Sequence, residues 1–133
     1  MKQIKIFATL IAATFCLNNF AQQTLKSDSL DILNYTIHLD SIDYSNDWIQ
    51  AKAEIKVTPR EDNIEAIAFD LLGLEIENIL VDSDTIFNYT YNDTLITIPL
   101  ISSINTSDTI DVKINYYGNP RVEQLYSWGG FHI

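Results

Sequence analysis

Histidine, a frequent metal ligand and general base, occurs at only two positions in this chain, His38 and His132. The two residues lie far apart in the sequence, and neither has a neighbour at metal-ligand spacing. No His-Glu-x-x-His helix is present to bind zinc. His38 falls on the polar face of a predicted strand, so a hydrated or hydrogen-bonded imidazole is the simpler interpretation.

Nucleophiles and phosphate-binding loops give no stronger signal. The chain has one cysteine, Cys16, and contains no Gly-x-Ser-x-Gly motif. Glycine occurs as a pair at Gly129-Gly130, which is too little for a phosphate loop. We therefore assign no catalytic, cofactor-binding or metal-binding residue within this chain.

Carboxylates are plentiful, with 18 acidic residues in the chain. Asp82 with Asp84, and Asp40 with Asp43 and Asp47, offer oxygen ligands of the kind that Ca²⁺ prefers. Neither group has the spacing of an EF-hand loop. Because aspartate is also favoured in turns, a purely structural role is the alternative for both groups.

Aromatic residues permit a second kind of site. Tyr89 and Tyr91, together with Trp48, Tyr116 or Tyr117, have the chemistry of a platform on which a sugar ring stacks. Aromatic side chains are also favoured in strands because they pack well there. Packing in the core or across strands is the alternative for all five.

The first residues have the pattern of a secretory signal peptide. Lys2 and Lys5 form a basic start, and Ile6–Leu17 is an apolar run too short to span a bilayer. Ala21 is a small residue at a suitable cleavage point, which places the mature start at Gln22. We predict export to the periplasm, the cell surface or the medium.

Residues 1–21 are thus the predicted signal peptide, and residues 22–133 are one small domain. Removing the leader leaves six basic residues against 18 acidic ones, a formal charge of −12 instead of −10. A surface this acidic disfavours nucleic acid and anionic membranes as partners. We expect no nucleic-acid binding and no membrane association after signal cleavage.

The rest of the chain is organised around Ile64–Val81, its most continuously apolar stretch, in which two strand-like runs meet at Gly73. We interpret these runs as two central strands of a sheet buried over much of both faces. A change of phase between Ile76 and Ile79 indicates a β-bulge or a bend. Asp82-Ser83-Asp84 is expected to be a tight turn.

Apolar and polar residues alternate with period two in most of the remaining segments, which is a strand pattern. A two-residue hairpin turn is expected at Asn92-Asp93, and a polar loop at Ser102–Asp108. The sequence predicts an all-β fold, an antiparallel β-sandwich of about seven strands. Besides the two in the central stretch, the strands are Ile32–Asp40, Trp48–Thr58, Ile86–Tyr91 (with Phe87, Tyr89 and Tyr91 on one face), Leu95–Leu100 and Thr109–Tyr117.

The order of these segments resembles the N-terminal domain of the aminopeptidase N family of zinc metallopeptidases, and its bacterial envelope members most closely. One departure is His132, which stands where relatives commonly have an aromatic residue. The segments that carry the resemblance are Asp31–Asp40, Ile67–Ile76, Tyr91–Ile98, Asp108–Pro120 and Trp128–Phe131.

The resemblance implies a saddle-like β-sandwich that precedes a thermolysin-like catalytic domain. It implies zinc in that catalytic domain and no cofactor in the present residues, whose role would be to shape the substrate cleft. The implied partners are the catalytic domain of the same polypeptide and, through the full-length enzyme, peptide substrates. Whether the chain is itself part of an enzyme is left open by these residues.

Two other classes of function remain open. One is a free-standing secreted β-sandwich module that binds glycan or protein, and the other is a structural domain of the cell envelope. The aromatic end of the chain, Tyr126–Ile133, bears on this choice. Such side chains are usually covered, either by their own domain or by a further part of the polypeptide.

Overall fold

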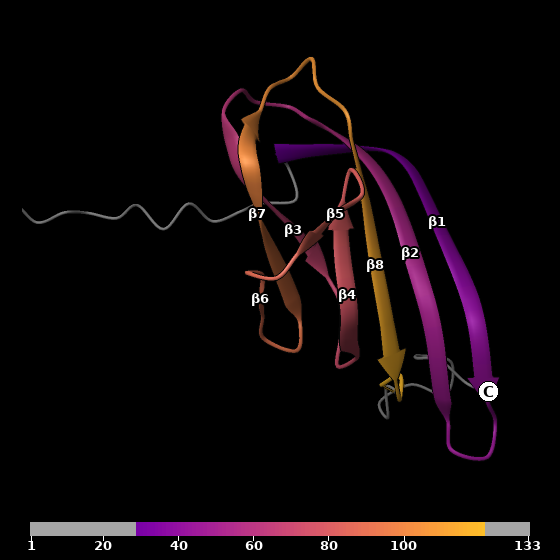
Figure 1. Cartoon of the computed structure of the whole chain (residues 1–133). Coiled ribbons are helices and arrows are strands. Elements are labelled where there is room, and N and C mark those ends of the chain that lie inside the picture. The colour runs from indigo at the N-terminus through magenta and orange to yellow at the C-terminus, as the bar shows by residue number, and fades with distance from the viewer. Residues whose placement is uncertain (1–28, 122–133) are drawn as a thin grey trace, which may run out of the picture.

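A computed structural model describes residues 29–121 of the chain and shows an all-β architecture (Figure 1). Eight strands form two antiparallel sheets, and this described part contains no helix, hence none long and apolar enough to cross a membrane. The strands are β1 (Leu30–Asp43), β2 (Trp48–Pro59), β3 (Ile64–Asp70), β4 (Glu75–Val81), β5 (Asp84–Ile86), β6 (Thr90–Tyr91), β7 (Leu95–Ile104) and β8 (Ile110–Gly118).

The larger sheet has five strands in the order β1-β2-β8-β4-β5. Strand β8, the last in sequence, lies in the middle and pairs with both β2 and β4. Strand β2 keeps the predicted alternation, with Ile49, Ala51, Ala53, Ile55 and Val57 all buried. The β4–β8 pairing shifts register between Ile76 and Asn78, so the predicted bulge is confirmed.

The smaller sheet has three strands in the order β3-β7-β6 and packs against the inner face of the larger one (Figure 1). The prediction that Ile64–Val81 forms two central strands of one sheet is wrong. Strand β3 is an edge of the small sheet, whereas β4 pairs with β8 and β5 in the large sheet. Gly73 lies between them with φ +66°, where the chain passes from one sheet to the other.

The core lies between the sheets and consists almost wholly of aliphatic side chains. Ile67 and Ile98 come from the small sheet, Val57, Ile79 and Val112 from the large one, and each is at most 1% exposed. No polar or charged residue is buried among the described residues. The sandwich is therefore held together by apolar packing between the two sheets.

Two turns show how local sequence directs the chain. Asp82 and Ser83 both have positive φ, 48° and 81°, which gives the predicted tight turn between β4 and β5. The turn at Asn92 is longer than predicted, because Tyr91 pairs with Ile96 and four residues lie between them. The Asn92 side chain holds this turn by accepting bonds from the backbone NH groups of Thr94 and Leu95.

The region after β5 departs from the prediction. Instead of one strand with three aromatic residues on one face, β5 and β6 belong to different sheets. Phe87 lies between them and is 87% exposed, whereas Tyr89 and Tyr91 pack against the core. Strand β7 also extends to Ile104, into the segment predicted to be a loop. The strand count is accordingly eight.

The loops at one end of the sandwich are bonded to each other across the two sheets. The backbone NH and hydroxyl of Thr106 both donate to the Asp62 carboxylate, each at 2.9 Å. The Asn63 NH donates to the Asn105 side chain at 3.1 Å, and the Thr58 hydroxyl donates to a backbone carbonyl at 2.7 Å. These bonds link the β2–β3 connection to the β7–β8 connection.

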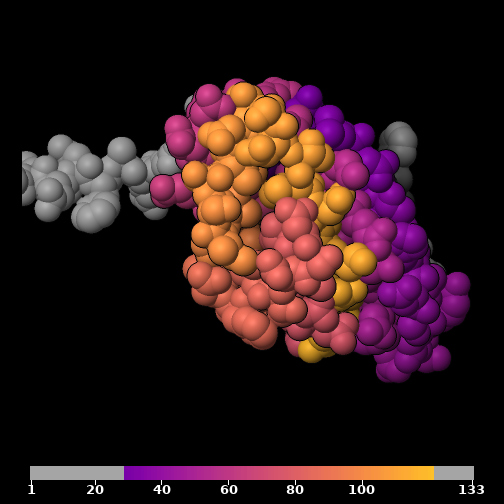
Figure 2. All heavy atoms as spheres, turned by 45° about the horizontal axis from the view of Figure 1, so that its top comes forward, coloured from indigo at the N-terminus to yellow at the C-terminus, as the bar shows by residue number. Residues whose placement is uncertain are grey.

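The two halves of the large sheet differ in how they are covered. Strands β2, β4 and β8 contribute buried side chains to the core, whereas β1 is the edge strand of the large sheet farthest from the small sheet (Figures 1 and 2). Strand β1 is mostly exposed on both faces. Its pairing with β2 is interrupted by register shifts between Ile32 and Asn34 and between Leu39 and Ser41.

Candidate functional site

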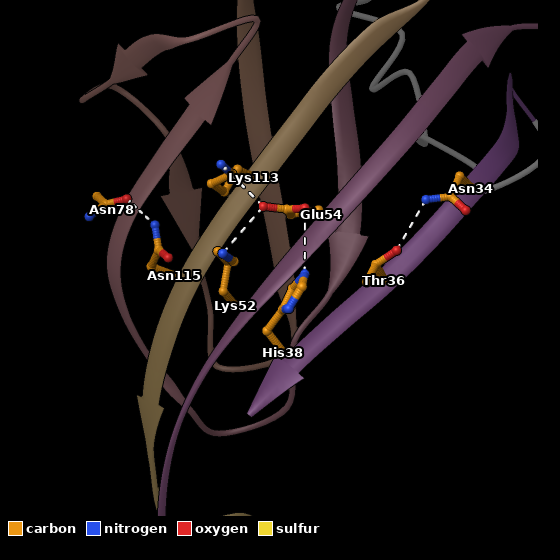
Figure 3. A network of polar contacts seen from close by, with 8 residues as sticks. All are labelled: Asn34, Thr36, His38, Lys52, Glu54, Asn78, Lys113 and Asn115. Carbon is orange, nitrogen blue, oxygen red and sulfur yellow. Dashed lines mark hydrogen bonds and ion pairs between the residues drawn. The ribbon is translucent and has the colours of Figure 1, made fainter. Parts of the chain in front are cut away.

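Charged side chains gather on the outer face of the large sheet, around Glu54 on β2 (Figure 3). Its carboxylate lies 3.3 Å from the Lys52 Nζ atom, 3.2 Å from the Lys113 Nζ atom and 3.5 Å from the His38 Nε2 atom. His38 on β1 pairs with Lys52 on β2, and Glu54 on β2 pairs with Lys113 on β8. Alternation along these strands places all four side chains on the same face of the sheet. Glu54 is therefore the hub of a three-strand network.

A hollow of about 460 Å³ opens beside this network. Lys56 on its wall pairs with Asp111 at 3.4 Å. The residues that line it are Asn34, Glu54, Ile55, Lys56, Leu80, Asp82, Ser83, Asp111, Val112 and Lys113. Positive and negative groups alternate around the hollow, so its field favours neither a simple anion nor a simple cation.

Hydrogen bonds from Lys113 and then Lys52 hold the pKa of the Glu54 carboxyl below its ordinary value. Glu54 is therefore ionised at neutral pH and does not act as a general acid there. The three lysines around it each have a carboxylate partner. The geometry is that of a charge-balanced surface network, in which each of these lysines is neutralised by a carboxylate.

The predicted aromatic platform is not assembled. Trp48 and Tyr117 lie on the outer face with ring centroids 6.1 Å apart, and Tyr116 is buried on the opposite face. Tyr89 and Tyr91 belong to the end of the small sheet, and the Tyr91 hydroxyl donates to the Leu71 carbonyl at 3.0 Å. The five aromatic residues thus serve different surfaces, and only one pair of rings is in contact.

The carboxylate groups considered for Ca²⁺ are engaged in turns. Asp43 accepts bonds from the Ser45 NH at 2.9 Å and the Asn46 side chain at 2.7 Å, and these bonds lower the pKa of its carboxyl. Asp82 accepts from the Asp111 NH at 2.8 Å. Among residues 29–121, no three metal-binding side chains come together. We accordingly assign these acids to the turns.

A second hollow, of about 430 Å³, lies at the end of the sandwich where β3 passes into β4. Tyr89, Tyr91 and Asp93 line it from the small sheet, and Glu75 and Arg121 complete it. Arg121 lies against Gly73, where a β-carbon would meet its Nε atom at 2.6 Å. No sequence pattern indicates this contact, because it depends on how the two sheets are stacked.

Several predicted features fall outside the described residues: the signal peptide with Cys16, His132, the Gly129-Gly130 pair and the aromatic end of the chain. The Glu54 network was missed by inspection of motifs. Its only sequence signal is the alternation of Lys52, Glu54 and Lys56 along one strand face. Lys113 joins it only when β8 is known to pair with β2.

No protein-family model matches the sequence, and no curated protein sequence matches it. Solved structures match its fold. An M1 zinc metallopeptidase from Deinococcus radiodurans, a mutant bound to a Tyr-Ser-Ala substrate, superposes with a TM-score of 0.66 at 19% identity. Aminopeptidase A from Legionella pneumophila, in complex with aspartic acid, superposes with a TM-score of 0.56 at 9% identity.

These matches cover most of this chain but only a small part of each larger protein. The first covers 76% of this chain but 23% of the Deinococcus enzyme, and the second covers 76% of this chain and 13% of the Legionella enzyme. The chain therefore spans less than a quarter of the length of the enzymes it superposes on. The β-sandwich predicted from the sequence is confirmed, and it is a domain fold found in M1 zinc metallopeptidases.

Proposed function

We propose that this chain is the non-catalytic N-terminal domain of a secreted, zinc-dependent aminopeptidase. In this proposal the domain packs on a catalytic domain of the same polypeptide and forms part of the wall of the substrate cleft. The catalytic domain would bind zinc and use a metal-activated water to attack the first peptide bond. The present residues would supply packing area and shape.

The observation that carries the proposal is the extent of the fold match. Three quarters of the chain superposes on less than a quarter of an M1 zinc metallopeptidase. The order of segments described above supports the same assignment. Low identity limits what the match shows to the fold, so the activity, the zinc and the cleft belong to the proposal.

The charge of the domain gives this proposal a substrate consequence. With 18 acidic against six basic residues in positions 22–133, the domain attracts cationic peptides over a distance of about one Debye length, roughly 8 Å at physiological salt. We expect the enzyme to favour basic peptides at low ionic strength. This preference should weaken as salt is added, because screening acts on the long-range part of the attraction.

The first test is to read the coding DNA beyond Ile133. We expect the reading frame to continue and to encode a His-Glu-x-x-His helix followed by a further glutamate. A stop codon directly after Ile133, with a native protein of the mass of the mature chain, would refute the proposal.

A second test concerns the division of labour. The full-length product should hydrolyse aminoacyl substrates and lose activity to a chelator, whereas residues 22–133 alone should be inactive with added zinc. Hydrolysis by the isolated residues would contradict a non-catalytic role. Export is tested separately, by the mass of the secreted product, which should begin at Gln22.

A further inference from the structure

A row of large apolar side chains stands exposed on the inner face of β1. Tyr35, Ile37 and Leu39 alternate along this strand and are about half exposed, between 49% and 53%. They pair with Ile55, Ala53 and Ala51 of β2, which are buried. The apolar inner face of the large sheet thus continues from the buried positions of β2 onto β1, where it is exposed.

This row differs from scattered surface hydrophobics, which are normal in folded proteins. Its three members lie on consecutive inward positions of one strand, in the regular stretch between the two register shifts. The opposite face of the same stretch carries Thr36 and His38. An alternation this clean is expected of a strand with one face covered.

The last described residues, after the end of β8, lie at the end of the sandwich where the chain passes between the two sheets. Asn119 still contacts the β1–β2 turn, where its side chain donates to the Asn46 carbonyl at 2.6 Å. Arg121, two residues later, lies against Gly73 on the path to the small sheet. The chain therefore leaves the described region on the inner side, the side on which Tyr35, Ile37 and Leu39 are exposed.

The next residues have the composition and the reach to cover the row. Residues 122–133 include Leu125, Tyr126, Trp128 and Phe131. Strands are about 4.8 Å apart, so β1 lies roughly 15 Å from β4 across the sheet. Seven residues from Val122 to Trp128 extend up to about 23 Å at ~3.3 Å each, which is enough to bring Trp128 over the row.

We propose that residues 122–133 of this same chain dock on the inner face of β1, with Trp128 as the anchor against Tyr35, Ile37 and Leu39. Tethering favours this occupant over a second copy, because an attached segment is present at a high effective concentration. The formal charge of −10 further disfavours bringing two copies together. The inference is independent of any catalytic domain.

Tryptophan fluorescence tests the proposal directly. The chain has two tryptophans, so Trp48→Phe leaves Trp128 as the only one. We expect blue-shifted emission and slow quenching by acrylamide. Adding Ile37→Asp should shift the emission to that of a solvated tryptophan, whereas Thr36→Asp, on the opposite face of the same strand, should leave it unchanged.

Cross-linking supplies a second readout in a Cys16→Ser background, which contains no other cysteine. Tyr126→Cys with Ile37→Cys should be joined within one chain by a short bis-maleimide, and Tyr126→Cys with Thr36→Cys should be joined far more slowly. Equal rates for the two pairs would refute the proposal. So would solvent-like Trp128 emission in the parent, or a blue shift that disappears on dilution and thereby assigns the face to a second copy.

Discussion

The two halves of the large sheet carry similar residues but have different surroundings. Ile79 on β4 and Ile37 on β1 are both strand isoleucines on the inner face of this sheet. Ile79 is 0% exposed because the small sheet covers it, and Ile37 is 53% exposed because the small sheet ends before it. Burial here depends on the second layer and is independent of residue type.

This difference separates the half of the sheet that stabilises the domain from the half whose surfaces remain exposed. The closed half, under β3, β7 and β6, contributes most of the buried apolar area and therefore most of the stability. The open half contributes an apolar inner face and a charged outer face on the same strands. Substitutions in the two halves should therefore have distinct effects.

The largest effect is expected in the closed half. Ile79→Ala removes a side chain that is packed on all sides, and such truncations cost about 2–5 kcal/mol in the free energy of unfolding. Ile32→Ala, at an equally exposed position on the inner face of β1 outside the proposed docking row, is the matched control and should cost about 1 kcal/mol or less. Urea denaturation of both variants measures the contrast. Equal costs would show that β1 is as well covered as β4.

A smaller effect is expected where the chain crosses between sheets. Gly73 has φ +66°, and a β-carbon there would meet Arg121, so Gly73→Ala should lower stability by about 1–2 kcal/mol. The double variant with Arg121→Ala separates the two causes, because it removes the steric contact and leaves the backbone strain. Thermal unfolding of the parent and the two variants gives the comparison, and a neutral Gly73→Ala would contradict a positive φ at this position.

The bonds between the loops at the end of the sandwich should contribute less again. Asp62→Ala removes two hydrogen bonds that Thr106 donates to its carboxylate. Because water competes for these bonds at an exposed carboxylate, we expect a small loss of stability, below that of Gly73→Ala. Glu61→Ala, at the adjacent exposed position, is the control and should be close to neutral in the same denaturation assay.

The smallest effect concerns the charged outer face and depends on pH. Hydrogen bonds from Lys113 and Lys52 depress the pKa of Glu54 in the folded state. Because the Glu54 pKa is lower in the folded state, the ionised carboxylate stabilises the fold at any pH above its unfolded-state pKa, about 4.5. This contribution is lost as the pH falls through the folded-state pKa. Glu54→Gln should flatten the fall in stability below about pH 4.5. An unchanged acid profile would show that the network contributes nothing.

Much of the fold could be predicted from the sequence because alternation is a local property. Strand β2 was placed almost to the residue, since five apolar positions in sequence alternate with polar ones. The turn at Asp82-Ser83 followed from residues that tolerate positive φ. The class of fold follows from such elements together, and the structural matches confirm it.

The assignment of strands to sheets could not be predicted in the same way. Ile64–Val81 is apolar throughout, and that pattern is the same whether its two strands share a sheet or lie in opposite ones. The Glu54 network was hidden for the same reason, because it needs the pairing of Glu54 with Lys113 from a distant strand. Cross-strand neighbours depend on topology, which composition and alternation do not specify.

The central place of β8 also constrains the order in which the domain can form. Within the large sheet, only two hairpins, β1–β2 and β4–β5, pair strands that are adjacent in sequence. Strand β8 must insert between these two hairpins to complete the sheet. Closing the sheet therefore waits for residues 110–118, nearly the last of the described part. Non-local pairings of this kind make folding slow. A growing chain would remain without its core until almost the whole domain had been synthesised.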